Sequence, residues 1–382
     1  MKNNDERLLA GYQPAPLENW YRHNYFNNDI DISGSGVAEY TFQEVKTIAK
    51  FSFDELDNIQ IKDGETIGSL KVRTQLATLF GTGDPDMVMV TNGANEALQL
   101  IVRSILDPGD EIITLGPCYH CHDKIALSMG CSVKKWTFSV DNNFDLDLCQ
   151  LENLFTKNTK ALFLNFPHNP TGKGISQNTL DRILELVRER NIYLVWDGVF
   201  QQLVYESPAP EDPIHNYDKA ITLGTFSKAY GAPGLRFGWI IAPRDVQAAC
   251  VRQKDYGNLF VAPITEFVAS KMLAQLTNFS IPRLKQAAEN RMIVDHWINN
   301  NEFNVSWRRP DGGVCGLLKL PGDWDDVAFC NQLLDRCKVL LVPGTCFELP
   351  GFVRLGFGGN TDNLREALVR MEKSFRERQQ VF

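Results

Sequence analysis

The feature of this sequence that most constrains its fold is an alternation of short apolar runs with amphipathic stretches between residues 87 and 241. Runs this apolar and β-branched are typical of strands that are covered on both faces. We identify six of them, at 87–91, 111–115, 161–165, 193–196, 220–223 and 237–241. Helical periodicity is clearest at 96–106 and at 178–190, where Ser176 is a candidate N-terminal cap. The alternation predicts an α/β fold with a mainly parallel sheet and helices on both faces.

The pattern changes near residue 281, and a chain of 382 residues corresponds to two or three domains at about 150 residues each. In this later part we expect a long helix to residue 297, shorter strands near 316–320 and 339–342, and a helix at 363–378. We therefore divide the chain into an N-terminal segment (1–45) that contributes to the small domain and the active site, a large domain (46–280), and a C-terminal small α+β domain (281–382).

The net charge and the first residues of the chain argue against several classes of partner and location. A net charge of −8, from 39 basic and 47 acidic residues, argues against binding to nucleic acid or to an anionic membrane. The sequence has no apolar run of transmembrane length, and its first residues lack the apolar segment of a signal peptide. Nine scattered cysteines are typical of free thiols in a reducing compartment. We expect a cytoplasmic protein that holds any anionic ligand at a local site.

One short cluster, Cys118-Tyr119-His120-Cys121-His122, resembles a metal knuckle. Structural zinc sites need a second pair of ligands at a matching distance, and the sequence offers none. We therefore expect no metal.

Polar motifs follow several of the predicted strands. Asn92-Gly93-Ala94-Asn95-Glu96 opens a helix, where backbone N–H groups and the helix dipole can receive a phosphate, although a plain turn explains it equally well. Asn169-Pro170-Thr171-Gly172 is typical of an ordinary loop, and a functional role for it requires other functional residues nearby. Asp197 stands at a strand end, where ligand sites occur in open α/β sheets, and is either a helix cap or a ligand group.

A candidate nucleophile follows the run at 220–223. Lys228, in Thr225-Phe226-Ser227-Lys228, is either a solvated loop charge or an amine whose pKa is lowered by its small, apolar and hydroxylated neighbours. Arg236 lies eight residues further along the chain.

The order and spacing of these motifs resemble the fold type I pyridoxal-phosphate enzymes, the aspartate aminotransferase superfamily. Asp197 follows Asn169 by 28 residues and precedes Lys228 by 31, and the resemblance covers nearly the whole chain. It implies a mainly parallel seven-stranded sheet, pyridoxal 5'-phosphate as the cofactor of the large domain, an amino acid substrate, and a homodimer with active sites between subunits.

The resemblance also implies individual roles. Lys228 would form the Schiff base and act as the catalytic base, Asp197 would bind the pyridinium nitrogen, and Asn169 would bind the ring oxygen. Arg354, in Arg354-Leu355-Gly356-Phe357, would grip the substrate α-carboxylate. The remaining cofactor-binding positions, most of them at the phosphate or the ring face, are Gly93, Ala94, Asn95, Tyr119, Phe200, Thr225, Ser227 and Arg236.

Two positions depart from the pattern of this superfamily. Phe200, in Asp197-Gly198-Val199-Phe200, stands where a tyrosine hydroxyl usually tunes the ring oxygen. Asp63 lies five residues before Gly68, where many members have a tyrosine that reaches the partner subunit's phosphate. An acid there would repel phosphate but could attract a cationic end of the substrate.

Further segments are similar to the capreomycidine synthase family of arginine-cyclising enzymes. These segments are Pro16-Leu17-Glu18-Asn19-Trp20, Asp31-Ile32-Ser33-Gly34-Ser35-Gly36-Val37, Tyr40-Thr41-Phe42 and Asn165-Phe166-Pro167-His168-Asn169-Pro170. This resemblance implies a cyclodehydratase that converts a hydroxylated L-arginine to a cyclic guanidino amino acid in natural-product biosynthesis. A 3-hydroxyl would lead to six-membered capreomycidine and a 4-hydroxyl to five-membered enduracididine. Gly34, where that family has a serine, slightly favours 4-hydroxyarginine.

Such a substrate needs groups for its guanidinium and its leaving hydroxyl. We expect a carboxylate at the guanidinium, with Glu18 as the first candidate and Asp63 from the partner subunit as the second. A solvent-exposed surface acid is the plainer interpretation of each. The positions expected around the substrate, besides Arg354, are Glu18, Ser33, Ser35, Gly36, Asp63 and Asn169.

Ser33 or Ser35 could bind the leaving hydroxyl, although both also suit a simple turn. His168 and His23 are candidate proton donors, with a structural role as the plainer interpretation. Two other functions stay open: an ordinary aminotransferase, which needs the same Lys228 and a 2-oxo acid, and a non-catalytic cofactor-binding regulator.

Overall fold

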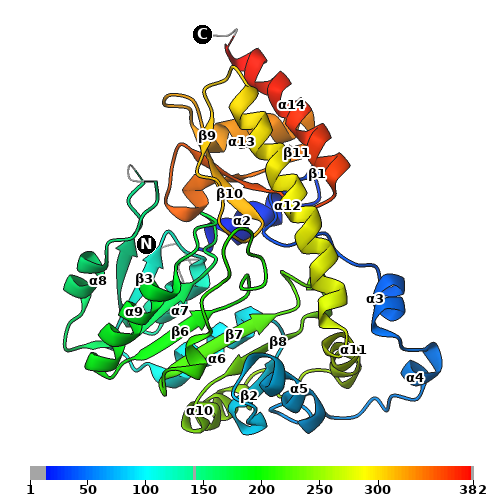
Figure 1. Cartoon of the computed structure of the whole chain (residues 1–382), viewed down its shortest axis with the longest axis vertical. Helices are drawn as coiled ribbons and strands as arrows, with labels where there is room; N and C mark the ends of the chain where they lie inside the picture. The colour runs from blue at the N-terminus through cyan, green and yellow to red at the C-terminus, as the bar shows by residue number, and fades with distance from the viewer. Residues whose placement is uncertain (1–13, 141–142, 380–382) are drawn as a thin grey trace, which may run out of the picture.

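A seven-stranded sheet forms the centre of the larger part of the molecule (Figure 1). The computed structural model describes residues 14–140 and 143–379, so the beginning of the expected N-terminal segment, residues 1–13, lies outside the described residues. The strand order is β2-β8-β7-β6-β5-β3-β4, and β8 runs antiparallel to both of its neighbours, while the other pairs are parallel. The strands are β2 (Val88–Thr91), β3 (Glu111–Gly116), β4 (Ser132–Thr137), β5 (Thr159–Asn165), β6 (Tyr193–Asp197), β7 (Ala220–Thr225) and β8 (Gly238–Ile241). The predicted mainly parallel α/β sheet and its six apolar runs are thus confirmed.

The apolar pattern misses one strand, β4, because this edge strand carries charged side chains. Lys134 and Lys135 are adjacent in it and only partly buried. Edge strands with charged side chains are common, since one side of such a strand has no neighbour to cover it. By contrast, every residue of β2, β3, β7 and β8 is buried, which requires cover on both faces of the sheet.

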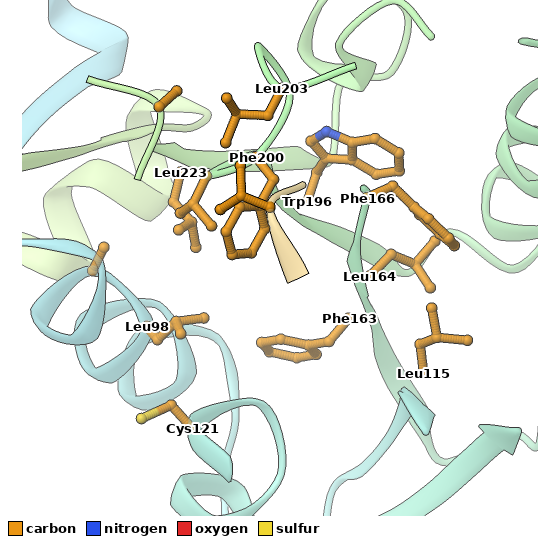
Figure 2. Close-up of a cluster of buried hydrophobic side chains, with 14 of the residues drawn as sticks. Leu98, Leu115, Cys121, Phe163, Leu164, Phe166, Trp196, Phe200, Leu203 and Leu223 are labelled. Atoms are coloured by element: carbon orange, nitrogen blue, oxygen red, sulfur yellow. The ribbon is translucent and has the colours of Figure 1, made fainter. Parts of the chain in front are cut away.

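Helices provide that cover. Ser176 caps the predicted helix α9 by accepting a hydrogen bond from the Thr179 amide, as expected from the sequence. The helices around the large sheet are α5 (Leu70–Phe80), α6 (Ala94–Ile105), α7 (Lys124–Ser128), α8 (Leu148–Leu154), α9 (Gln177–Arg190), α10 (Arg244–Lys254) and α11 (Pro263–Leu273). Figure 2 shows buried side chains from α6, β5 and the segment after β6, including Leu98, Phe163 and Phe200, gathered into one apolar cluster.

The smaller part of the molecule is built on a four-stranded antiparallel sheet of order β12-β13-β10-β9. Its helix α12 (Leu276–Asn300) is continuous, so the proposed domain boundary at 280/281 falls near the start of a helix. The other elements are β9 (Ser306–Trp307), β10 (Cys315–Lys319), α13 (Asp326–Cys337), β11 (Val339–Leu340), β12 (Val342–Pro343), β13 (Phe352–Gly356) and α14 (Thr361–Gln379). Within residues 14–140 and 143–379 we find no helix with the length and apolar character needed to cross a membrane.

The N-terminal segment runs between the two parts and contacts both. It contains α2 (Pro16–Asn24) and β1 (Ile30–Asp31); α3 (Phe42–Ala49) extends past its end at residue 45, and α4 (Phe53–Asp57) follows. β1 pairs in parallel with β11 of the small domain, whereas the Val37 amide donates to the carbonyl of Lys228 in the large domain. Figure 1 shows α2 at the junction of the two parts, with α3 and α4 extending away from them.

Candidate active site

A cavity of about 790 Å³ opens between the carboxyl edge of the large sheet, the N-terminal segment and β13. Such an edge is where ligands bind in open α/β sheets. The predicted site residues that line it are Glu18, Ser35, Gly36, Ala94, Asn95, Tyr119, Asn169, Asp197, Phe200, Thr225, Ser227, Lys228, Arg236 and Arg354. Gly93 and Ser33 adjoin it through Arg236 and Arg354, respectively. The structure therefore brings most of the predicted set into one place.

Three predicted residues lie elsewhere. Asp63 is exposed and does not line this chain's cavity. His23 is exposed on α2, where its Nδ1 donates to the carbonyl of Asn19 at 2.8 Å. His168 is buried beside Thr171, and burial lowers the pKa of its imidazole to about 3, so this side chain stays neutral. Neither histidine lines the cavity.

Lys228 stands three residues after the end of β7, in the cavity wall. Burial, together with the nearby positive charge of Arg354, lowers the pKa of its amine to about 8. Its Nζ donates a hydrogen bond to Ser35 Oγ at 2.8 Å and lies 5.7 Å from the centre of the Phe200 ring. A lysine in this state is partly neutral near physiological pH, which suits a nucleophile or a base.

Asp197 is the last residue of β6 and accepts a hydrogen bond from a histidine that we did not predict at the site. Its Oδ2 lies 2.8 Å from Nε2 of His122, and both side chains are buried. His122 belongs to the cluster that resembles a metal knuckle. Among the described residues, no group of three or more His, Cys, Asp or Glu side chains is placed to hold a metal ion. A signal was present, since His122 follows β3 and Asp197 ends β6, two strands with a common carboxyl edge.

A cationic recess lies where α6 begins. Gly93, with a φ of +86°, is the N-cap of this 12-residue helix, and a Cβ built on it would lie 2.5 Å from Arg236 Nη2. Glycine suits this left-handed conformation, and a side chain here would also push the Arg236 guanidinium from its place. Arg236 is exposed to the cavity. Beside it, the hydroxyls of Thr225 and Ser227 are hydrogen-bonded to each other at 3.0 Å. Helix N–H groups, hydroxyls and a guanidinium together form a suitable site for a phosphate.

Arg354 on β13 is almost completely buried, with 1% of its surface exposed. Its guanidinium donates to the Ser33 carbonyl from Nε and Nη2, to Asn169 Oδ1 from Nη1, and to the hydroxyl of Tyr21 from Nη2. Tyr21 was not recognised as part of the site from the sequence, although Glu18 of the same helix was. All three partner residues are far from Arg354 in the chain, and Tyr21 belongs to none of the sequence motifs that we identified.

Glu18 lies on the same helix and reaches the opposite side of the cavity. Its Oε1 accepts a hydrogen bond from the hydroxyl of Tyr119 at 3.1 Å, and this hydroxyl is also 3.1 Å from Asn95 Nδ2. Burial raises the pKa of the Tyr119 phenol, which keeps the phenol protonated and able to donate. Helix α2 therefore places one carboxylate and one phenol in the cavity, at Glu18 and Tyr21.

The donor set fits pyridoxal 5'-phosphate. The recess formed by Gly93 and Arg236 matches a phosphate, Asp197, held by His122, offers a carboxylate for the ring nitrogen, and Lys228 offers an amine for an aldehyde. All three features belong to one cavity or its wall.

The family model for aminotransferase class I and II matches residues 36–371. Capreomycidine synthase of Streptomyces vinaceus is 35% identical over 94% of this chain and 93% of its own length. Among solved structures, the PLP-dependent cyclase OrfR superposes with a TM-score of 0.90 at 32% identity, over 96% of this chain and 98% of that one. A PLP-dependent aminotransferase from Streptococcus suis gives 0.91 at 29% identity, again over 96% and 98%. The chain belongs to the aminotransferase class I and II family and is a pyridoxal 5'-phosphate-dependent enzyme.

Proposed function

We propose that this enzyme cyclises a hydroxylated L-arginine with loss of one water. The observation that carries the proposal is the set of charges in one cavity: a buried guanidinium at Arg354 for a carboxylate, a carboxylate at Glu18 for a guanidinium, and the amine of Lys228. The similarity to capreomycidine synthase and to the cyclase OrfR supports the same reaction class.

The proposed roles at the cofactor follow the geometry described above. Lys228 would hold the aldehyde carbon, Asp197 the ring nitrogen, Asn169 the ring oxygen, and the recess of Gly93 and Arg236 the phosphate. When bound, the cofactor links covalently to the substrate amine and withdraws electrons from the α-carbon. His122 keeps the carboxylate of Asp197 oriented by donating a hydrogen bond to it.

Proton movements in this proposal belong to Lys228 and Ser35. The neutral amine of Lys228 removes the α-proton. Because Ser35 Oγ accepts from Lys228, its own O–H can point to the departing hydroxyl, which leaves with a proton as water. A guanidine nitrogen then bonds to the carbon that lost oxygen and gives up its own proton, which restores the α-hydrogen. The sum of these steps is the loss of one water, with no oxidant or second substrate.

The position of the hydroxyl group on the arginine substrate is the most specific part of the proposal. The similarity to capreomycidine synthase supports 3-hydroxyarginine, and we take this as the first substrate to test. Gly34, which favours 4-hydroxyarginine on sequence grounds, lines the cavity, and nothing lies within 4 Å of a Cβ built on it. A serine would fit there, so Gly34 provides room beside the site, and 4-hydroxyarginine is the second candidate.

The test is to incubate the purified holoenzyme separately with arginine, 3-hydroxyarginine and 4-hydroxyarginine, each with and without 2-oxoglutarate. We expect a product lighter by one water from a hydroxyarginine without the oxo acid, and proton NMR then distinguishes a six-membered from a five-membered ring. The Lys228→Ala protein is the control and should give no product. Glutamate formation that depends on the oxo acid, with no dehydrated product, would instead establish the aminotransferase function, which the Streptococcus suis neighbour supports.

We also propose a homodimer. The arm formed by α3 and α4 extends from the molecule and exposes Phe42, Phe53 and, just beyond it, Ile61. Apolar side chains on a projecting arm are typical of a surface that another chain covers. Asp63 lies two residues beyond Ile61 and would approach the partner's cavity. Sedimentation velocity should give twice the mass of the chain, and a monomer at micromolar concentration would contradict this proposal.

A further inference from the structure

The guanidinium of Arg354 has little hydrogen-bonding capacity left for a substrate. A guanidinium carries five N–H groups. Four are engaged: Nε and one N–H of Nη2 at the Ser33 carbonyl, one N–H of Nη1 at Asn169, and the second N–H of Nη2 at Tyr21. A carboxylate held by two N–H groups must therefore displace at least one of these three acceptors.

The acceptor best placed to yield is the hydroxyl of Tyr21. The Ser33 carbonyl takes two N–H groups at 2.7 and 3.1 Å, and a buried carbonyl that lost both would be costly. Asn169 Oδ1 also accepts a hydrogen bond from the Cys315 thiol at 3.6 Å, so it is held by two donors. Tyr21, by contrast, lines the cavity, and its hydroxyl is both an acceptor from Arg354 at 2.6 Å and a donor to Ser33 at 3.1 Å. A hydroxyl can exchange its donor and acceptor roles by rotating its hydrogen.

We propose that Tyr21 is a substrate-positioning residue: the α-carboxylate replaces its hydroxyl at Arg354 Nη2, and the hydroxyl then donates its hydrogen to that carboxylate. This inference rests on the proposed function, because it requires an amino acid substrate. The Tyr21 phenol can serve as such a donor because burial raises its pKa above the usual value and keeps it protonated, even with Arg354 beside it.

The consequence concerns selection of the substrate by a single short helix. Glu18 and Tyr21 are three residues apart on α2, a spacing that puts both on one face of a helix. Leu17 of the same helix is buried against Val342 and Phe347, so the helix is anchored to the small domain. A substrate with a carboxylate at one end and a guanidinium at the other would contact α2 twice.

The test compares Tyr21→Phe with Tyr25→Phe, which removes the same atom from the C-cap residue of α2, a residue that also lines the cavity. The probes are arginine, which has no leaving hydroxyl, and agmatine, which lacks only the carboxylate. Binding of each to the holoenzyme is followed by the absorbance of the cofactor. We expect Tyr21→Phe to weaken arginine binding about tenfold and agmatine binding less than twofold, since a hydrogen bond to a charged group is lost only with arginine. Tyr25→Phe should change neither by more than about twofold.

Other outcomes separate the inference from the function on which it rests. Equal weakening of both probes by Tyr21→Phe would assign a purely structural role to Tyr21, and no weakening would also overturn the inference. If the wild-type enzyme binds norvaline as tightly as arginine, the guanidino substrate class itself is wrong. Should Tyr21→Phe fail to fold, a crystal structure of the wild-type enzyme with arginine decides the question. Tyr21 Oη must then lie within hydrogen-bond distance of the carboxylate, and a hydroxyl still bound to Nη2 would contradict the proposal.

Discussion

The two ends of the cavity are built in different ways. The cofactor end is made by residues at or just after the ends of strands in one largely buried sheet and by residues at the start of α6. The substrate end is made by a nine-residue helix, an irregular segment around Ser33 and one strand of the small domain. Its central contact, from Tyr21 to Arg354, joins residues 333 apart in the chain. The comparison shows that the proposed cofactor-binding residues are positioned by one sheet, whereas the proposed substrate-binding residues are positioned by contacts between segments that are distant in the chain.

The largest expected effect is at the cofactor end. Replacing Lys228 by alanine removes both the covalent attachment and the proposed base, and we expect product formation to fall by about four orders of magnitude. Lys228→Arg is the matched control, because it keeps a positive charge but cannot attach the cofactor, and it should be equally inactive. Borohydride reduction followed by mass measurement checks the attachment. An alanine variant that is still yellow and active would exclude Lys228 from this role.

A pH dependence should follow from the same amine. With a pKa lowered to about 8, Lys228 is mostly protonated below that pH and cannot attack an aldehyde. We expect the rate of cofactor attachment to cofactor-free protein to rise about tenfold per pH unit up to pH 8 and to level off above it. The absorbance of the attached cofactor gives this rate. A rate that continues to rise toward pH 10 would show that the amine is not perturbed.

A smaller effect is expected behind the cofactor end. His122→Phe leaves Asp197 Oδ2 buried without its donor, and we expect kcat to fall about tenfold while KM changes little. The absorbance spectrum of the bound cofactor should shift as well, because we propose that Asp197 binds the ring nitrogen. His120→Phe, two residues away and not bonded to Asp197, is the control. A normal spectrum with reduced stability alone would mean that His122 has only a structural role.

At the substrate end, Glu18→Gln keeps an acceptor for Tyr119 but removes the negative charge. We expect KM for a guanidino substrate to rise about tenfold, with cofactor attachment unchanged. Binding of norvaline, which has no guanidinium, should not change. Asp63→Asn is the parallel variant, and a larger effect there than at Glu18 would transfer the guanidinium site to the partner subunit's Asp63.

The smallest effect is expected at Gly34. Gly34→Ser adds a hydroxyl where nothing lies within 4 Å, so the free energy of unfolding should change by less than about 0.5 kcal/mol. The ratio of activities on 3- and 4-hydroxyarginine measures whether this position reads the hydroxyl. An unchanged ratio would remove Gly34 from the specificity argument.

The difference between the two ends also explains what the sequence could predict. Strand ends such as Asp197 and Thr225 are visible because buried runs mark them locally. The hydrogen bond between His122 and Asp197 joins the segment after β3 to the end of β6, and a single sequence records no such distance. Helix α2 has only nine residues, too few for a clear period, and Tyr21 has its role only because Arg354 lies beside it in the folded chain. Edge strand β4 was not predicted, because Lys134 and Lys135 interrupt its apolar pattern.

The pairing of β1 with β11 has a consequence for biosynthesis, because it joins residues 30–31 to residues 339–340. A ribosome adds about 5–20 residues per second. After β1 has been synthesised, on the order of 15 to 60 s therefore pass before β11, the strand with which it pairs, has been made. During that interval the buried side of α2, with Leu17, is exposed to the surrounding medium. Because Asp31 of β1 and Arg354 of β13 both line the cavity, its wall is complete only after β11 and β13 have been synthesised.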